Sequence, residues 1–471
     1  MNLKKVLHFA IGPIAAAGLG LITLPFVAWF FSVEDVGKLT MMQVVLSLSV
    51  SFFSLAMHQA YVREYHEEKD KAVLFRVSVL PGLLFLSFTV IVCLVAPFSL
   101  SKLLFGIESK LLTGLLIVGI YASFLINFLS HLLRMEEKGL AFSATKIAPK
   151  LFFVFFIALI MCFSLTANFT TLMQMNTYAI LFSLLIFLFI TKETWLSALK
   201  SQTDLFLLKK TLLFSLPLVA GGLAYWGLTT MDRFFLRSMV GFEELGVYAL
   251  AASLAGAVSV ISTVFSNLWH PTLYKWVKQG VSNSKIQAVT ESILLLVCLI
   301  WSLVGIFSFI VPYFLPSEYR AIEYLIVACV SMPLFYMLSQ TTGVGIGIKR
   351  KSSYAMLASL IAFLSNAIFN YFLIPIYGAA GAALATVISF FIFFLIRTEA
   401  SAITWQSLPR LKIYLVLTMY TVATCICLLT QGNLPYFSIV WVCLFMIVSA
   451  TFYQRIETSL QTIKQYIKKR G

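Results

Sequence analysis

Two lysines inside an apolar stretch are well suited to bind an anion. Lys146 and Lys150 are four residues apart, which places both side chains on one face of a helix. Lys150 is about ten residues from the polar end of the stretch near Leu140, which is about 15 Å along a helix. An ionisable group near the centre of a ~30 Å apolar layer is costly and usually functional. Lys146 is equally explained by a side chain that reaches the membrane interface, an explanation that fits Lys150 poorly.

A second polar group ends the apolar run at 37–60. His58 and Gln59 precede Arg63 by about one helical turn. Arginine can donate two parallel hydrogen bonds to a phosphate, so these three residues are candidates for binding an anionic ligand. An ordinary anchor at the membrane interface explains Arg63 equally well.

The charged segment from Asp232 to Arg237 separates two further apolar runs, and we expect a short polar hinge there. Arg233 and Arg237 are four residues apart and share one face of a helix end. They are candidates for ligand binding, and Asp232 is a candidate for binding a proton or a sodium ion. A structural lock within a helical hairpin explains the same three charges equally well.

The other reactive residues form no catalytic or metal-binding pattern. All seven cysteines lie in apolar runs, and Cys425 and Cys427 point to different faces of a helix. The five histidines are scattered, and the sequence contains no nucleotide-binding loop of the Walker type. We therefore expect no catalytic residue, no metal, no cofactor and no direct use of ATP.

Composition identifies the elements that must position these residues. The chain is 60% hydrophobic and 11% charged, with a mean hydropathy of +0.95, whereas soluble domains carry about 25% charged residues. We therefore predict an all-α polytopic membrane protein. A net charge of +15 is explained by basic loops on one side of a membrane, without nucleic acid as a partner.

About fourteen apolar runs are each near the ~20 residues that a membrane-spanning helix needs. They are residues 8–31, 37–60, 75–98, 111–133, 140–163, 170–191, 211–231, 245–267, 288–312, 321–342, 354–374, 378–396, 411–430 and 435–453. The first run follows two lysines, as in a signal peptide, but it exceeds the ~7–15 apolar residues of a cleaved signal. We therefore expect it to be retained as the first span.

One hairpin motif occurs twice. An offset of 209 residues carries the first copy onto the second, so that Glu34, Asp35 and Gly37 correspond to Glu243, Glu244 and Gly246. Internal repeats are common in transporters. We predict six-helix halves at 1–200 and 201–400, two further helices at 401–456 and a basic tail at 457–471 on the anionic inner leaflet.

Three stretches resemble bacterial polysaccharide flippases of the Wzx type, within the multidrug/oligosaccharidyl-lipid/polysaccharide exporter superfamily. They are the segment 232–248 with its Asp-Arg-Phe corner, the segment 59–65 and the segment 366–383. The resemblance covers about residues 1 to 400. It implies a protein of the bacterial inner membrane that moves undecaprenyl-diphosphate-linked oligosaccharide, such as an O-antigen unit for lipopolysaccharide biosynthesis. The implied mechanism is alternating access driven by an H⁺ or Na⁺ gradient. The implied partners are membrane lipids and other polysaccharide assembly proteins.

Two other functions are weaker fits. A multidrug antiporter of the same superfamily, coupled to sodium or protons, usually moves cations and should carry carboxylates within the spans of its first half, and no acidic residue lies mid-span there. A membrane-embedded polysaccharide polymerase or ligase should have a large outer loop, which this chain lacks. We therefore expect a transporter and not an enzyme.

Basic residues predict the orientation. With the N-terminus in the cytoplasm, about 27 Lys and Arg lie at inner ends of the runs and about six at outer ends, as the positive-inside rule requires. An even number of spans places the C-terminus in the cytoplasm too. Alkaline phosphatase folds only in an oxidising compartment, so fusions after Ser32 and Gly241 should be active and fusions after Lys71 and Gly280 inactive. A reversed result at consecutive sites would show a missing or an extra span.

Overall fold

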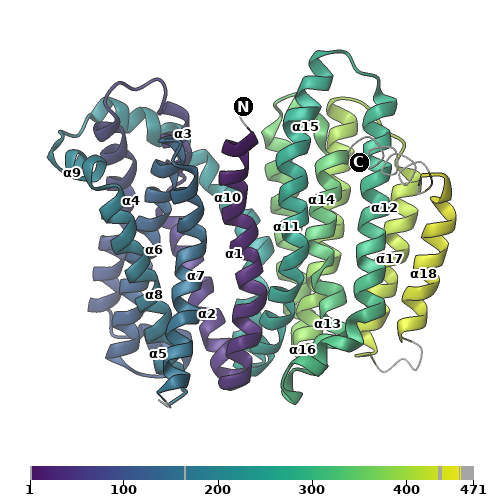
Figure 1. Ribbon diagram of the computed structural model, residues 1–471, viewed down its shortest axis with the longest axis horizontal. Coiled ribbons are helices and arrows are strands. Elements are labelled where there is room, and N and C mark those ends of the chain that lie inside the picture. Colours follow the sequence, from purple (N-terminus) through teal and green to yellow (C-terminus); the bar gives the residue numbers. More distant parts are fainter. Residues whose placement is uncertain (1–2, 164–165, 433–436, 456, 458–471) are drawn as a thin grey trace, which may run out of the picture. The chain divides into compact units, whose positions relative to one another are not determined.

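The computed structural model describes residues 3–163, 166–432, 437–455 and 457, and every regular element in these ranges is a helix (Figure 1). The chain forms two compact units, Met1–Ala249 and Leu250–Gly471. The first unit contains α1 (Leu3–Phe30), α2 (Val33–Phe53), α3 (Met57–Glu64), α4 (Lys71–Val95), α5 (Leu100–Phe105), α6 (Lys110–Met135), α7 (Gly139–Cys162), α8 (Phe169–Ile190), α9 (Lys192–Lys200), α10 (Leu205–Met239) and the start of α11 (Phe242–Lys278).

The second unit contains the rest of α11 and the helices that follow it. These are α12 (Asn283–Phe307), the 3₁₀ helices η1 (Ser308–Phe314) and η2 (Ser317–Tyr319), α13 (Ile322–Cys329), α14 (Ser331–Thr342), α15 (Val344–Ile348), α16 (Ser352–Thr404), α17 (Leu411–Leu429) and α18 (Phe437–Thr451). In this unit α12 packs against α14 and α18, and α16 packs against α13, α14, α15 and α17.

The helices agree with the predicted number of spans. Within the described ranges, eleven helical segments are long and apolar enough to cross a membrane, and Ile14–Phe30 and Phe437–Thr451 are shorter apolar helices. The segment α16 joins two predicted spans at a kink, where Gly378 has a φ of 53°. With α16 counted as two spans, the all-α fold of about fourteen spans is confirmed.

The division into compact units falls inside α11 and does not test the sequence repeat. The predicted halves at 1–200 and 201–400 and the extra helices at 401–456 therefore stay predictions. Apart from residue 457, the predicted basic tail at 457–471 lies outside the described residues.

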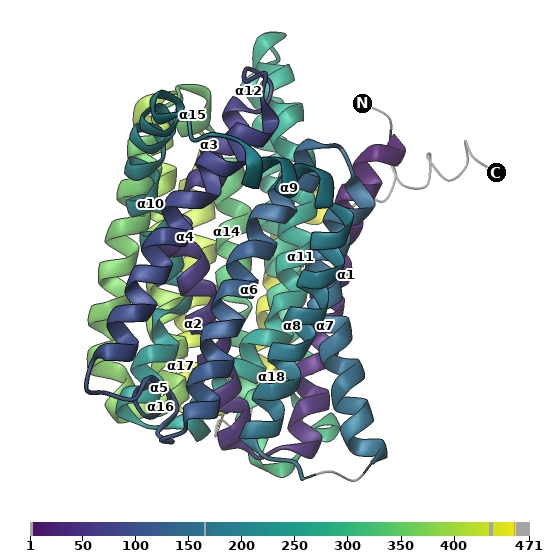
Figure 2. The same ribbon diagram turned by 90° about the vertical axis from the view of Figure 1, so that its left-hand side faces the viewer.

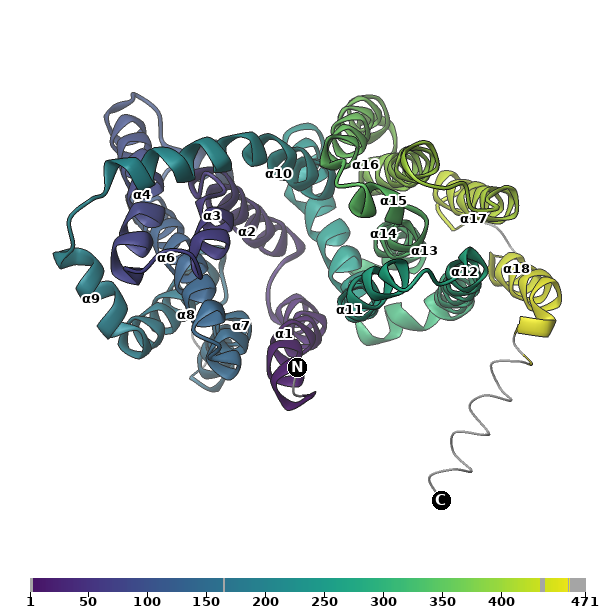
Figure 3. The ribbon, with the colours of Figure 1, turned by 90° about the horizontal axis from the view of Figure 1, so that it is seen from above.

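In the first unit, α7 packs between α1 and α8, and α10 packs against α2, α3 and α4. Seen from above, α1 lies beside α7 (Figure 3). The short helices α3 and α9 lie at one end of this unit and α5 lies at the other (Figure 2). The end with α3 carries Arg63, and the end with α5 carries the charged segment 232–237, since Arg237 contacts Leu103 of α5.

Side-chain caps begin several of the helices. Ser32 Oγ accepts from the amide of the third residue after it at 3.1 Å, and Asp70 Oδ1 accepts from the amides of the second and third residues after it. Asp204 caps α10 in the same way. Each cap satisfies amides that have no partner within the helix, which is why short polar residues precede these apolar runs.

The predicted span at 37–60 is not one continuous helix. Leu55 and Ala56 have φ values of 49° and 53°, in the left-handed region that residues with a side chain rarely adopt. These residues end α2 at Phe53 and allow α3 to start at Met57. The side chains of α3 are therefore aligned independently of α2.

The prediction of a hinge at Asp232 to Arg237 is wrong. These residues are helical and form the last turns of α10. The chain turns at Val240 and Gly241, where Gly241 has a φ of 103°. A glycine adopts this conformation without the steric cost that a side chain would add. The charged residues before it remain helical because the turn is made by the glycine.

The two copies of the repeated hairpin motif contact each other at this turn. A Cβ atom added to Gly37 would lie 2.0 Å from the carbonyl oxygen of Phe242, and one added to Gly246 would lie 2.3 Å from that of Val33. Val33 and Phe242 are themselves related by the offset of 209 residues. The acidic pair of each copy lies in the first turn of its helix, where it is favoured by the helix dipole.

Charged side chains surround this glycine contact. Lys38 is 8% exposed and lies 2.7 Å from Glu34, with its ammonium 5.6 Å from the centre of the Phe242 ring. The guanidinium of Arg237 lies 5.7 Å from the same ring and donates to the carbonyl of Leu103 in α5. A buried cation is tolerated here because a carboxylate and aromatic rings partner it.

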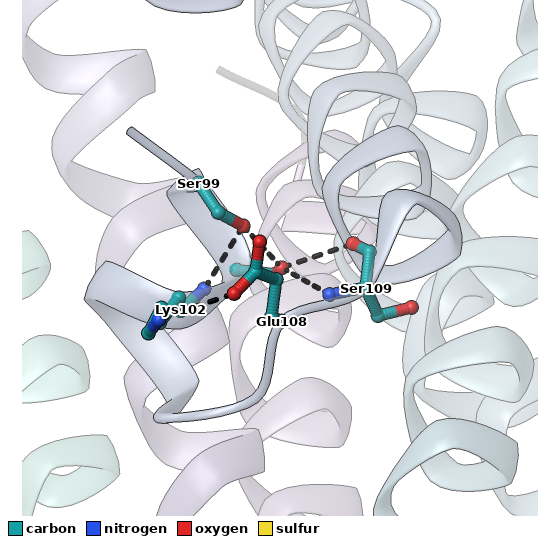
Figure 4. Close-up of polar contacts among 5 residues, drawn as sticks. Ser99, Lys102, Glu108 and Ser109 are labelled. Atoms are coloured by element: carbon teal, nitrogen blue, oxygen red, sulfur yellow. Dashed lines mark hydrogen bonds and ion pairs between the residues drawn. The ribbon is translucent and has the colours of Figure 1, made fainter. Parts of the chain in front are cut away.

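The turn that presents Leu103 is itself held by hydroxyl groups. Ser101 Oγ accepts from the amide of Ser109 at 3.0 Å and donates to its carbonyl at 2.9 Å. Figure 4 shows Lys102 beside Glu108 in the same turn, with Nζ and Oε2 3.1 Å apart. These bonds fix the connection between α4 and α6 against which Arg237 docks.

Asp232 is also part of the corner. Its carboxylate is 3% exposed, accepts from the Tyr248 hydroxyl and accepts from the amide of Arg233 at 2.9 Å. Arg233 Nη1 donates to the carbonyl of Thr229 at 3.1 Å. The bond from Tyr248 joins α10 to the first turns of α11, whereas the other two bonds lie within α10. A structural lock and an ion site both stay predictions for Asp232.

We expect Gly37→Ala and Gly246→Ala to destabilise the protein, because each new methyl group would collide with backbone atoms that a side-chain rotation cannot move. The cost should reach the roughly 1–3 kcal/mol of an overpacked core site. Thermal unfolding in detergent measures the loss. Gly222→Ala, in α10 with no atom within 4 Å of the added Cβ, is the matched control and should unfold like wild type.

Substitutions at Asp232 and Tyr248 separate a structural lock from an ion site. Tyr248→Phe leaves a buried carboxylate short of a hydrogen bond and should cost about 1–3 kcal/mol of stability. Asp232→Asn retains an oxygen that can accept from Tyr248 and should unfold closer to wild type. An Asp232→Asn protein that is fully stable but inactive would instead assign this carboxylate to ion coupling.

Candidate functional site

Lys150 lies against α1. Its Nζ donates to the carbonyl of Ala16 at 2.7 Å, and a Cβ atom added to Gly20 would lie 3.0 Å from the same nitrogen. The missing side chain of Gly20 therefore leaves space for the ammonium group. A second bond joins the two helices, since the amide of Gly12 donates to Ser143 Oγ at 3.0 Å.

The first residue of α7 leaves the predicted membrane depth of Lys150 almost unchanged, and that depth stays a prediction. Lys150 follows the first residue of α7, Gly139, by eleven residues, which is about 16 Å of helix. The residue keeps an exposed surface beyond its contact with α1. Among the described residues it forms no ion pair, so its charge is available to an anionic ligand.

Two histidines from different helices stack near Lys146. The rings of His58 in α3 and His131 in α6 have centroids 4.8 Å apart and an interplanar angle of 28°. Lys146 is close enough to interact electrostatically with both, and its own ammonium lies 5.9 Å from the Phe142 ring. The buried Nδ1 atoms of both histidines have no hydrogen-bond partner among the described residues.

His131 was missed by sequence reasoning. It is 73 residues away from His58 in the chain, and no motif links the two. The only available signal was that both follow long apolar runs at ends predicted to face the same side. That signal places them at a similar depth, whereas the stacking depends on how α3 is aligned after the break at Leu55 and Ala56.

Arg63 belongs to a neighbouring group. Its guanidinium lies 4.3 Å from the centre of the Phe214 ring, and its Nε lies 3.6 Å from Glu64. Glu64 is 4% exposed and also pairs with Lys210 of α10. Gln59 is exposed on α3. Arg63 is therefore partly neutralised, in contrast to Lys146 and Lys150.

The structure thus brings some of the predicted site residues together and separates others. His58 and Lys146 lie together with His131, and Lys150 lies one helical turn further along α7. Asp232, Arg233 and Arg237 lie at the end of the unit that contains α5, since Arg237 contacts Leu103. They do not join the first group.

The first group is chemically a set of donors for an anion. Ammonium and imidazole groups donate to phosphate oxygens, and charge-assisted bonds of this kind are about twice as strong as neutral ones. Nearby, burial raises the pKa of the Tyr65 phenol and Glu136 acts in the same direction, so this phenol adds no negative charge. No cluster of three or more metal-binding side chains occurs in the described part of the chain.

Comparison with known proteins identifies the fold. The structure is similar to "Lipid II flippase MurJ, inward closed conformation", with a TM-score of 0.69 and 18% identity over 96% of this chain and 99% of that one. It is also similar to a multidrug resistance MATE family transporter in its inward-facing conformation, with a TM-score of 0.54 and 14% identity over 85% and 94% of the two chains. At these identities the likeness concerns the fold. No curated protein matches the chain.

Sequence comparison identifies the family. Residues 2–277, more than half of the chain, match the family model described as polysaccharide biosynthesis protein. The matched region contains the repeated hairpin, the Asp-Arg-Phe corner and both lysines of α7. Together with the fold that the chain shares with MurJ, this match confirms the resemblance to the Wzx-type family. The chain belongs to the polysaccharide biosynthesis protein family.

Proposed function

We propose that this protein is a flippase for undecaprenyl-diphosphate-linked oligosaccharide, which it moves from the cytoplasmic to the periplasmic leaflet of the bacterial inner membrane. The observation that carries the proposal is the cationic group around α7 in a member of this family. Lys146 and Lys150 supply positive charge at membrane depth, and His58 and His131 supply further donors. Both match the acceptor oxygens of a diphosphate.

The charge of the diphosphate is the main barrier to translocation. An uncompensated charge at the centre of the bilayer costs several kcal/mol by any measure. Lys150 lowers this cost because its ammonium group lies about half-way along the ~30 Å apolar layer. The lipid tail needs no such site, since it can remain in the hydrocarbon throughout.

The contact between Lys150 and Ala16 supplies a link between cargo and helix movement. A phosphate oxygen is a charged acceptor and binds an ammonium group more strongly than a neutral carbonyl does. Arriving cargo therefore competes with Ala16 for Lys150 and weakens the attachment of α1 to α7. Release of α1 then accompanies binding of the cargo. The cargo therefore binds one conformation more strongly than the other, as any cargo-driven conformational change requires.

The remaining parts of the proposal follow the family's architecture. The internal repeat supports alternating access of two halves, and the basic inner loops support cytoplasmic termini. We propose an H⁺ or Na⁺ gradient as the energy source. We propose that the cargo carries an O-antigen unit for lipopolysaccharide, or a related surface polysaccharide unit. After translocation it passes to other polysaccharide assembly proteins.

The alternative is a multidrug antiporter of the same superfamily, and the similarity to a MATE transporter supports only a shared fold. A site for cationic cargo should present carboxylates at membrane depth. The group around α7 presents cations and imidazoles instead, which favours anionic cargo.

Lys150→Ala should block surface polysaccharide assembly and cause lipid-linked units to accumulate on the cytoplasmic leaflet. Loss of several kcal/mol of charge compensation slows translocation by at least about a hundredfold. Lys150→Arg keeps the charge and should retain part of the activity, although its planar head is not equivalent. Surface polysaccharide and lipid-linked intermediates are measured in cells with equal amounts of membrane protein.

Lys138→Ala is the matched control, because Lys138 precedes α7 and pairs with Glu136 outside the apolar stretch. It should assemble polysaccharide at the wild-type level. Lys146→Ala, nearer the interface, should have an intermediate effect. Normal polysaccharide in Lys150→Ala would contradict the role of this lysine and the anionic nature of the cargo. A loss of activity matched by a loss of thermal stability would reduce Lys150 to a tie between α1 and α7.

A further inference from the structure

A basic cavity lies entirely within the unit Leu250–Gly471. Its volume is about 430 Å³, within the ~300–1,000 Å³ typical of small-molecule sites. Helices α11, α14 and α16 and the turn after α15 supply its polar lining, which includes His270, Tyr274, Gln340, Arg350, Ser352 and Arg397. None of the residues that line it, all of them in the described part of the chain, is acidic.

Arg397 is held in a defined position at this cavity. Its Nη1 lies 3.4 Å from Ser339 Oγ, and its guanidinium lies 5.3 Å from the centre of the Phe393 ring. A Cβ atom added to Gly343 would lie 3.4 Å from Nε. The nearby ring and the close approach to Gly343 restrict the guanidinium group, which can donate two hydrogen bonds to a phosphate.

Arg350 supplies a second guanidinium from the turn after α15. It is exposed and has a φ of 54°. It forms no ion pair with any residue that the structure describes. Its charge is therefore not neutralised within the unit, unlike that of Arg410, which pairs with Glu399.

Further polar groups of the lining are held by hydrogen bonds and packing. The Trp269 Nε1 group donates to the carbonyl of Gln340 at 3.0 Å, and His270 Nε2 lies 3.1 Å from Gln340 Oε1. Behind them, Leu273 and Val344 line the cavity and belong to a packed apolar cluster that includes Trp269. The donors are thus preorganised by packing, which lowers the entropic cost of binding a ligand.

We propose that this cavity is a second anion site, which binds a phosphate-bearing group between Arg350 and Arg397. The lining contains no carboxylate and matches the acceptor oxygens of a phosphate. Its donors are two guanidinium groups, an imidazole, a phenol and an amide. The cavity adjoins the basic turn Lys349–Lys351, at an end expected to face the cytoplasm and its anionic lipids. The ligand is a phospholipid headgroup or a free phosphorylated compound. This inference does not depend on the proposed translocation of cargo, because it concerns binding to the second unit.

Binding of inorganic pyrophosphate to the purified full chain in detergent tests the site by calorimetry. The same titration of Lys150→Ala, which lacks the central cation of the proposed cargo site, identifies the part of the signal that belongs to this cavity. Arg350→Gln should weaken binding at least about tenfold, the typical effect of losing a charge-assisted hydrogen bond. Arg350 is exposed, so this variant should fold normally. Arg397→Lys should also weaken binding, because it keeps the charge and loses the fork. Lys351→Gln, which removes the same charge from the next residue outside the cavity lining, is the control and should bind like wild type.

Nanodiscs distinguish the two sources of phosphate. A lipid-headgroup site is expected to raise the thermal stability of wild type, and not of Arg350→Gln, when phosphatidic acid is added to phosphatidylcholine. Pyrophosphate binding that Arg350→Gln weakens, without this lipid effect, supports a free phosphorylated ligand. Equal binding by Arg350→Gln and Lys351→Gln, or no response of wild type to either probe, would overturn the proposal.

Discussion

The contact between two glycine-bearing helix starts is the constraint on which the first unit depends. Gly37 and Gly246 allow the backbones of α2 and α11 to approach so closely that no side chain fits between them. Because the two residues are equivalent in the repeat, the same contact is made twice across one junction. The end of α10 must then fit beside it, which explains why this corner contains so many specific bonds, from Lys38 with Glu34 to Asp232 with Tyr248.

The corner and the group around α7 differ in the acidic residues that they contain. At the corner, Lys38 pairs with Glu34, and Arg237 has a carbonyl and an aromatic ring as partners. Around α7, Lys150 donates to the carbonyl of Ala16 and Lys146 lies near the Phe142 ring, but neither lysine forms an ion pair with the described residues. A protein retains uncompensated cations at membrane depth only at a cost in stability. Under the function proposed above, the anionic cargo supplies the missing negative charge.

The sequence predicted those features of the structure that depend mainly on one physical quantity. Hydropathy alone predicted the all-α fold and about fourteen spans, because a backbone in lipid has to satisfy its hydrogen bonds within helices. The depth of Lys150 was predicted from its distance along one apolar run and stays a prediction. Local backbone geometry was less predictable. Nothing in the composition around Leu55 and Ala56 indicates their positive φ values. From the sequence we also predicted the turn at the charged residues Asp232 to Arg237, whereas the chain turns at Gly241. The pairing of His58 with His131 depends on the break at Leu55 and Ala56 and was missed for the same reason.

The positive-inside rule also concealed part of the chemistry. It counts every Lys and Arg near an inner helix end alike, so Arg350 and Arg397 entered the prediction only as evidence for orientation. The structure separates such residues by their surroundings. Lys349 and Lys351 are exposed in the same turn as Arg350 without lining the cavity, whereas Arg350 and Arg397 share a cavity that no acidic residue lines. A cation that serves topology needs only to remain in water or among headgroups, but one that binds a ligand needs a fixed direction and a preorganised wall. The Phe393 ring and the close approach to Gly343 restrict the direction of Arg397, and counting charges along a sequence cannot reveal it.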